Sequence, residues 1–106
     1  MNEKRPDTVI SMSSAVDYSD QSIVSKVILK RPNGQITLFS FDAGEELSEH
    51  TTPYDAFITV TDGTAVVSIA GEPNTVNTGE SIVLPANIPH AVKALKRFKM
   101  MLVMIK

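Results

Sequence analysis

The residues of this chain best suited to chemistry are its only two histidines, His50 and His90. An imidazole can exchange a proton near pH 7, accept a hydrogen bond or ligate a metal, so two imidazoles brought together would form a site. Thr52 and Tyr54 follow the first histidine and add hydroxyl groups nearby. The absence of cysteine excludes thiolate nucleophiles, disulfides and zinc–thiolate centres. A simpler alternative stays open, in which both rings only hydrogen-bond to backbone or water in a partly solvated pocket.

Short strands between regularly spaced turns are the elements that must position these histidines. Turn signals occur at Asn33-Gly34, Asp62-Gly63, 71–74 and Thr78-Gly79, and two prolines stiffen a further turn over 85–89. No segment keeps a helical period for three turns. We therefore predict an all-β fold, a sandwich or barrel. The expected strands are 8–12, 23–30, 35–41, 56–61, 64–70, 80–84, 90–94 and 99–105.

Alternation along the strands predicts which side chains share the interior with the histidines. Successive residues of a strand point to opposite faces, so every second residue lies on the same side. The residues expected to face inward with His50 and His90 are Thr52, Ala56, Ile58, Val60, Val92 and Ala94.

The last expected strand, 99–105, is apolar on both faces. Such a strand is typically buried on both sides, here by the interior and by another sheet or subunit. Methionine makes an adaptable pocket lining, and we take Met101 as the candidate lining residue. Filling of the core is the alternative use of these methionines.

Charge and hydropathy exclude several partners. The formal net charge is only −2, so the chain has no basic field to bind nucleic acid. Residues 1–7 are charged and lack the apolar core of a signal peptide, and the longest apolar run, 100–105, is too short to span a bilayer. We expect a cytoplasmic protein without nucleic-acid or membrane partners.

The length of 106 residues predicts a single domain. We expect residues 1–33 to form an N-terminal tail with edge or swapped strands, the first seven residues being loose, and 34–105 to form the barrel. The apolar residues between 8 and 30 would add strands to a neighbour's sheet and cover its edge. A homodimer is therefore predicted.

The spacing of these residues resembles the motifs of the cupin superfamily, small β-barrels of the jelly-roll type. In the first cupin motif, Gly44 and His50 stand at the expected distance and Gly63 is the closing glycine. Thr52 takes the place of the second histidine, and Ala56 takes the place of the glutamate.

The second cupin motif is also in register. Gly79, Pro85 and His90 match, while Asn87 stands at the glycine position and Ala94 at the final asparagine position. Asn can replace glycine there because it tolerates the left-handed region better than other side chains. The resemblance covers roughly residues 34–105 and implies a single jelly-roll barrel of the cupin type.

In cupins, three histidines and one glutamate typically hold a divalent metal, so the resemblance implies a degenerate metal site in this chain. Our first hypothesis is a small-molecule-binding cupin, with His50, Thr52, Tyr54, His90 and Met101 as candidate ligand-binding residues. The alternative is a metal-dependent isomerase, dioxygenase or decarboxylase with a rearranged ligand set, in which His50 and His90 bind zinc, nickel, iron or manganese. A third hypothesis is a sensory module that acts through a partner. Whether the protein is an enzyme stays open, and no cofactor is assigned.

Overall fold

The computed structural model describes residues 8–106, which form nine strands and no helix. The predicted loose tail, 1–7, lies outside the described residues. Among those described, none belongs to a helix long and apolar enough to cross a membrane. The strands are β1 (Ile23–Arg31), β2 (Gly34–Phe41), β3 (Glu46–His50), β4 (Asp55–Asp62), β5 (Thr64–Ile69), β6 (Glu72–Asn77), β7 (Ser81–Leu84), β8 (His90–Lys93) and β9 (Phe98–Ile105).

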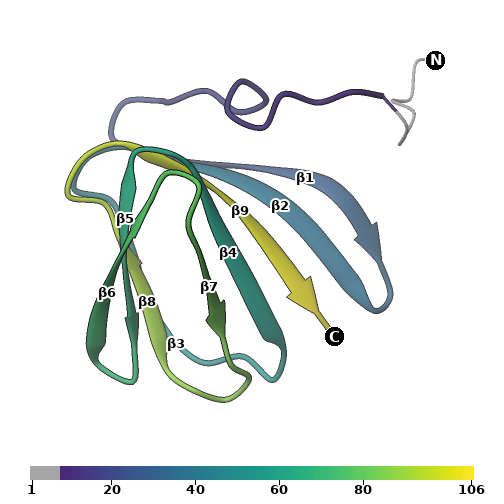
Figure 1. The fold of residues 1–106 in the computed structure, drawn as a ribbon, viewed down its shortest axis with the longest axis vertical. Helices are drawn as coiled ribbons and strands as arrows, with labels where there is room; N and C mark the ends of the chain where they lie inside the picture. The colour runs from purple at the N-terminus through teal and green to yellow at the C-terminus, as the bar shows by residue number, and fades with distance from the viewer. Residues whose placement is uncertain (1–7) are drawn as a thin grey trace.

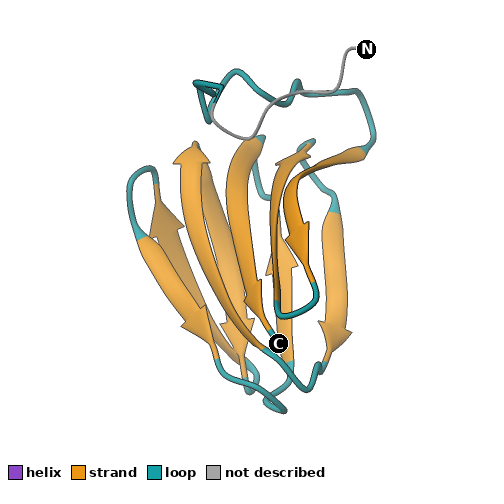
Figure 2. Cartoon of the chain, turned by 90° about the vertical axis from the view of Figure 1, so that its right-hand side faces the viewer, coloured by secondary structure: helices purple, strands orange, loops and turns teal. Residues whose placement is uncertain are grey.

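The strands form two antiparallel sheets that face each other as the two layers of a jelly roll (Figure 1). The larger sheet has the order β1-β2-β9-β4-β7, and the smaller one has the order β3-β8-β5-β6. Figure 2 shows the strands running nearly side by side, with the loops gathered at the two ends. The all-β jelly-roll prediction is confirmed.

Two strands were not predicted, and one predicted strand is wrong. Strand β6 begins within the segment expected to be a turn, 71–74, and accommodates Pro73 because it is the outer strand of its sheet. Strand β3 was also missed, because four of its five residues are polar or charged. Residues 8–12 do not form a strand. Val9 is 95% exposed, so burial of its side chain does not hold an extended conformation there.

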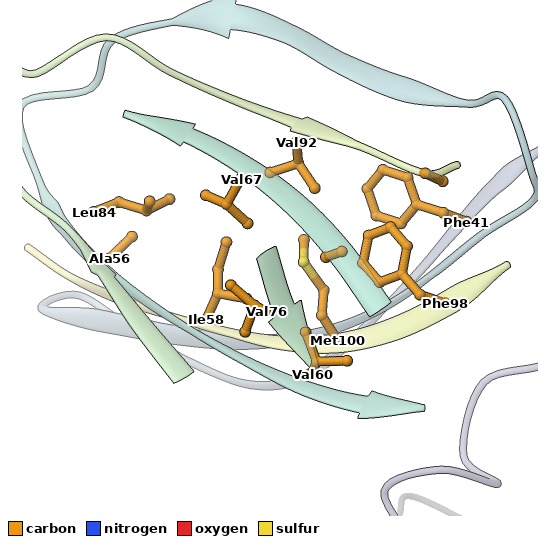
Figure 3. Close-up of a cluster of buried hydrophobic side chains, with 12 residues drawn as sticks. Phe41, Ala56, Ile58, Val60, Val67, Val76, Leu84, Val92, Phe98 and Met100 are labelled. Atoms are coloured by element: carbon orange, nitrogen blue, oxygen red, sulfur yellow. The ribbon is translucent and has the colours of Figure 1, made fainter. Parts of the chain in front are cut away.

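The core lies between the sheets and is built from alternate residues of facing strands (Figure 3). Phe41 and Phe98 are fully buried and stack with ring centroids 4.5 Å apart. The predicted inward residues Ala56, Ile58, Val60, Val92 and Ala94 are all buried, which confirms the alternation on β4 and β8. Aromatic stacking closes one end of the core, and smaller side chains line the other.

The segment before β1 crosses the outer face of the larger sheet and is tied to it. Ser40 Oγ donates to the carbonyl of Asp17 at 2.7 Å, and Lys99 Nζ donates to the carbonyl of Ser13 at 2.6 Å. Val16 is buried between these two anchors in the sequence. This segment therefore covers one part of that face without joining the sheet.

An ionic cluster fixes the same segment to the end of the barrel. The Arg97 guanidinium donates to Asp42 at 2.8 Å and to Asp20 at 2.7 Å. The hydrogen bond from Arg97, supported by backbone N–H donors of Gln21 and Ala43, lowers the pKa of Asp42 to about 2. The position of Arg97 is thus set by residues distant in sequence.

Candidate functional site

A small cavity between the two sheets holds both histidines. Its volume is about 50 Å³. It lies at the end of the core away from the Phe41–Phe98 stack, where Ala56 and Leu84 are found in Figure 3. The residues that line it are Leu47, His50, Thr52, Ala56, Ile58, Leu84, His90, Val92, Met100, Leu102 and Met104.

The two histidines meet because β3 and β8 are paired in the smaller sheet. His50 and His90 stand opposite each other in the register. Their ring centroids are 4.4 Å apart, with the ring planes at 66°. His90 is only 6% exposed, whereas His50 is exposed. His90 therefore lies at the inner end of the pair, and His50 lies toward the mouth of the cavity.

An irregularity in β3 brings a further side chain to the cavity. Leu47 pairs with Val92, and His50 pairs with His90. Between these two pairs, β3 contains one residue more than β8. In a regular strand, residues three apart would point to opposite faces. The extra residue lets both Leu47 and His50 line the cavity.

Backbone carbonyls fix the tautomer of both rings. The carbonyl oxygen of Ser48 lies 2.7 Å from Nδ1 of His50, and that of Ile88 lies 3.2 Å from Nδ1 of His90. A carbonyl oxygen can only accept, so each Nδ1 must carry the proton. In the neutral ring, Nε2 then keeps its lone pair and acts as an acceptor.

Burial favours the neutral form of His90. Desolvation lowers the pKa of His90 below its ordinary 6.5, the hydrogen bond to the Ile88 carbonyl partly opposes this, and the nearby His50 charge lowers the pKa further. A buried imidazole loses solvation on protonation, which explains the sign of the main effect. At neutral pH, His90 thus offers a lone pair rather than a positive charge.

The two loops beside the histidines are joined across the mouth. Asn87 N–H donates to the Thr52 carbonyl at 2.7 Å, and Ala86 N–H donates to Asp55 Oδ1 at 2.8 Å. Asn87 adopts a φ of 65°, which agrees with its place at a glycine position of the motif. These bonds hold both histidine-bearing segments in a fixed relation.

The structure brings together only some of the residues predicted to bind a ligand. His50, Thr52 and His90 line the cavity, but Tyr54 and Met101 do not. Tyr54 lies at the surface, with Lys106 Nζ 5.6 Å from its ring centroid. Met101 lies on the face of β9 opposite to the cavity-lining side chains of that strand, which are Met100, Leu102 and Met104. Sequence reasoning missed these three, Leu47 and Leu84.

The donor set of the cavity is too small for a resident metal. Catalytic metal sites generally use three protein ligands, whereas this cavity offers two imidazole nitrogens and the neutral hydroxyl of Thr52. Within residues 8–106, no group of three or more His, Asp or Glu side chains is placed to hold a metal ion. The residues therefore do not fit a three-ligand metal centre.

Fold, motif positions and the histidine pair together define the class of protein. The cupin-domain family model matches residues 37–106, and this chain belongs to the cupin family. It is similar over 99% of its length to a conserved protein of unknown function from Streptococcus pyogenes, with 35% identity, a TM-score of 0.90 and 92% of that chain covered. It is also similar to a cupin 2 conserved barrel domain protein from Leptotrichia buccalis, with 44% identity and a TM-score of 0.88 over 92% of this chain. The match spans only 47% of the Leptotrichia chain.

More distant structures share the fold alone. They include KdgF from Halomonas sp., at 23% identity and a TM-score of 0.73, with 86% of this chain and 87% of that chain covered. No curated protein matches this chain.

Proposed function

We propose that this cupin binds a small organic molecule in the cavity beside His50 and His90. The observation that carries the proposal is the shared tautomer of the two rings. Both Nδ1–H groups are engaged by backbone carbonyls, which leaves two Nε2 lone pairs beside a cavity whose only other polar lining residue is Thr52. Hydrogen-bond acceptors in a mainly apolar pocket favour ligands that carry a hydrogen-bond donor over ligands that do not.

The surroundings of the histidines define the chemistry of this ligand. The wall opposite them is aliphatic or thioether, from Leu84, Met100 and Met104, and no acid or base other than the histidines lines the cavity. We infer a neutral molecule with an apolar body and a hydroxyl or N–H group. The volume of about 50 Å³ is well below the roughly 150 Å³ of a cavity that binds benzene, so without enlargement it admits only one end of a ligand. Methionine side chains can change rotamer to enlarge it.

A metal-dependent enzyme is the second candidate, and one observation favours it. In a histidine that ligates a metal, the other ring nitrogen commonly donates a hydrogen bond to a carbonyl or carboxylate. His50 and His90 both donate such a bond from Nδ1 to a backbone carbonyl. The missing third protein ligand weighs against this candidate, since two imidazoles leave the charge of a divalent ion uncompensated.

The test uses ¹⁵N-labelled protein purified without a histidine tag and phenol as the probe. Toluene is the control molecule, since it has the same apolar ring without the donor. Phenol should shift the Nε2 resonances of His50 and His90 saturably, with a dissociation constant of about 1 mM or tighter, or about 4 kcal/mol. That affinity lies within the range open to so small a ligand. Toluene should bind at least tenfold more weakly.

Variants separate the two candidates. Phenol has a single O–H donor, so the variant that removes the histidine accepting it, His50→Ala or His90→Ala, should weaken phenol binding about tenfold, which is the loss of one hydrogen bond of about 1.4 kcal/mol. Tyr54→Phe, which removes a hydroxyl outside the cavity, should leave it unchanged. Equal binding of phenol and toluene would refute the role of the histidines. About one iron, manganese, nickel or zinc per wild-type chain, lost in both histidine variants, would support the metal-dependent candidate instead.

A further inference from the structure

The histidine pair meets a ligand only with hydrogen-bond acceptors. Three residues that line the cavity have polar side chains: His50, Thr52 and His90. The Nδ1–H of each imidazole is already donated to a backbone carbonyl, so each ring offers a ligand only the lone pair of Nε2. The hydroxyl of Thr52 therefore decides whether any side chain of the cavity is free to donate.

The hydroxyl proton of Thr52 is committed as well. Thr52 Oγ1 donates to the carbonyl oxygen of Tyr54 at 3.0 Å and accepts from the Tyr54 N–H at 3.4 Å. A hydroxyl has one proton and two lone pairs, so one lone pair stays free. Thr52 thus acts toward a ligand as an acceptor.

The remaining lining side chains add no donor. They are aliphatic or thioether groups, and a thioether sulfur is itself a weak acceptor. Within residues 8–106, no side chain that lines the cavity has a hydrogen free to donate to a ligand. Such a wall disfavours carboxylate and carbonyl oxygens and favours N–H and O–H groups.

Burial ranks the three acceptors by their need for a donor from the ligand. His90 is buried, Thr52 is half-buried and His50 is exposed. When a ligand enters, His50 can keep a hydrogen bond to solvent, whereas His90 and Thr52 lose contact with water. A buried acceptor without a donor is destabilising. A well-matched ligand therefore supplies one hydrogen to His90 and one to Thr52.

We propose that Thr52 makes the cavity selective for a neutral –NH₂ group on a planar carbon, such as the end of a primary amide, over a group with a single donor. One N–H donates to His90 Nε2, and the other donates to Thr52 Oγ1. The inference rests on the proposed function, because it uses the same cavity and the same lone pair of His90. A ligand with a single donor leaves one of the two acceptors without a partner.

The loops at the mouth hold the two acceptors in a fixed relation. The bond from Asn87 N–H to the Thr52 carbonyl, at 2.7 Å, joins the segment that carries Thr52 to the segment that leads into His90. Pro85 and Pro89 restrict the backbone of the second segment. Acceptors that are already in place lose little freedom on binding, so they can discriminate between ligands by the number of donors.

Charge excludes other groups that have several N–H donors. Aliphatic amines and guanidines are protonated at neutral pH. Within the described part of the chain, no carboxylate lines the cavity to pair with such a cation, and burial of an unpaired charge is costly. A primary amide has two N–H donors without a charge. Its carbonyl oxygen would point past the exposed His50, toward water at the mouth.

The experiment compares three related probes by NMR of the ¹⁵N-labelled full chain at about pH 7.5, where imidazole is neutral. Benzamide has two N–H donors, N-methylbenzamide has one, and benzoate has none. Benzamide should shift the Nε2 resonance of His90 saturably and should bind about tenfold more tightly than N-methylbenzamide, which is the effect of one hydrogen bond. Benzoate, which differs from benzamide only in the acceptor that replaces –NH₂, should bind at least about a hundredfold more weakly than benzamide.

Variants of Thr52 separate selectivity from a structural role. Thr52→Val removes the acceptor at similar volume, so it should weaken benzamide binding about tenfold. Phenol binding should stay within about twofold, because phenol donates only to a histidine. The preference for benzamide over N-methylbenzamide should disappear in Thr52→Val and persist in Thr52→Ser, which keeps the hydroxyl. Thr59→Val is the matched control and should change neither affinity, since the Thr59 hydroxyl lies outside the cavity and is bonded to that of Ser81.

The outcomes distinguish this inference from the proposed function. If neither phenol nor benzamide shifts the histidine resonances, the proposed function fails, and the inference fails with it. If phenol binds but benzamide binds no more tightly than N-methylbenzamide or benzoate, only the selectivity assigned to Thr52 is overturned. Equal losses of phenol and benzamide affinity in Thr52→Val would also overturn it, because they would show that Thr52 acts through the structure of the mouth alone.

Discussion

Replacement of Gly63 by alanine should destabilise the fold much more than the same change at Gly79. Both glycines belong to the cupin motifs and adopt positive φ, +80° and +86°. An L-residue pays about 1–2 kcal/mol in this region. A Cβ at position 63 would lie 2.5 Å from the Arg97 carbonyl oxygen and 3.0 Å from Phe98 Cβ, whereas a Cβ at position 79 would meet nothing within 4 Å.

The difference between the two variants isolates the steric part of the cost. Gly79→Ala should lower the free energy of unfolding by about 1–2 kcal/mol, which is the backbone penalty alone. Gly63→Ala carries the same penalty and also displaces the backbone at Arg97 and Phe98. Phe98 is fully buried against Phe41, and overpacking of such a core costs a further 1–3 kcal/mol or so. We therefore expect a total loss of about 2–5 kcal/mol.

Urea unfolding followed by circular dichroism measures both variants, and unchanged m-values would show that the unfolded state is comparable. A loss of this size is a large fraction of the stability of a small domain, about 5–15 kcal/mol. If the two alanine variants differ by less than about 0.5 kcal/mol, the close approach at Gly63 does not determine the choice of residue and the reasoning fails.

Three further predictions concern the site and the core. The folded-state pKa of His90 is lowered, so the unfolded chain binds more protons below pH 6.5 and stability should fall as the pH drops through that window. His90→Asn should flatten this dependence in urea titrations from about pH 7.5 to pH 5, and an unchanged slope would contradict it. Asn87→Ala should lose about 1 kcal/mol at its φ of 65°, whereas Asn87→Gly should stay within about 0.5 kcal/mol; equal losses in thermal melts would argue against the left-handed requirement. Phe98→Ala should cost about 3–5 kcal/mol in urea unfolding, and a loss below about 1 kcal/mol would show that the stack on Phe41 contributes little.

The frame of the site was predictable because each of its parts has a local cause. Gly63 and Gly79 stand where the chain reverses with positive φ, and the glycine-to-histidine spacing places His50 and His90 at corresponding strand ends. The pairing of β3 with β8 then brings the two rings together. Alternation on β4 and β8 followed from β-strand geometry, because both strands are regular where they contribute to the core.

The lining of the cavity was less predictable because it depends on register. The extra residue in β3 between Leu47 and His50 has no signature in the sequence, since a bulge there needs no glycine or proline. Tyr54 was chosen for its distance from His50 along the chain. The turn around Pro53 directs it to the surface instead.

Strand β9 explains why Met101 does not line the cavity. Alternation divides it into Met100, Leu102 and Met104 on one face and Met101 and Val103 on the other, but both faces are apolar, so the sequence does not say which one is inside. The pairing of Phe98 with Phe41 decides it, because the stacked rings belong to the core and every second residue after Phe98 must follow them inward. Since the opposite face is equally apolar, composition alone could not distinguish Met101 from the methionines that line the cavity. The inner face of β9 lines the cavity in which we propose that a ligand binds.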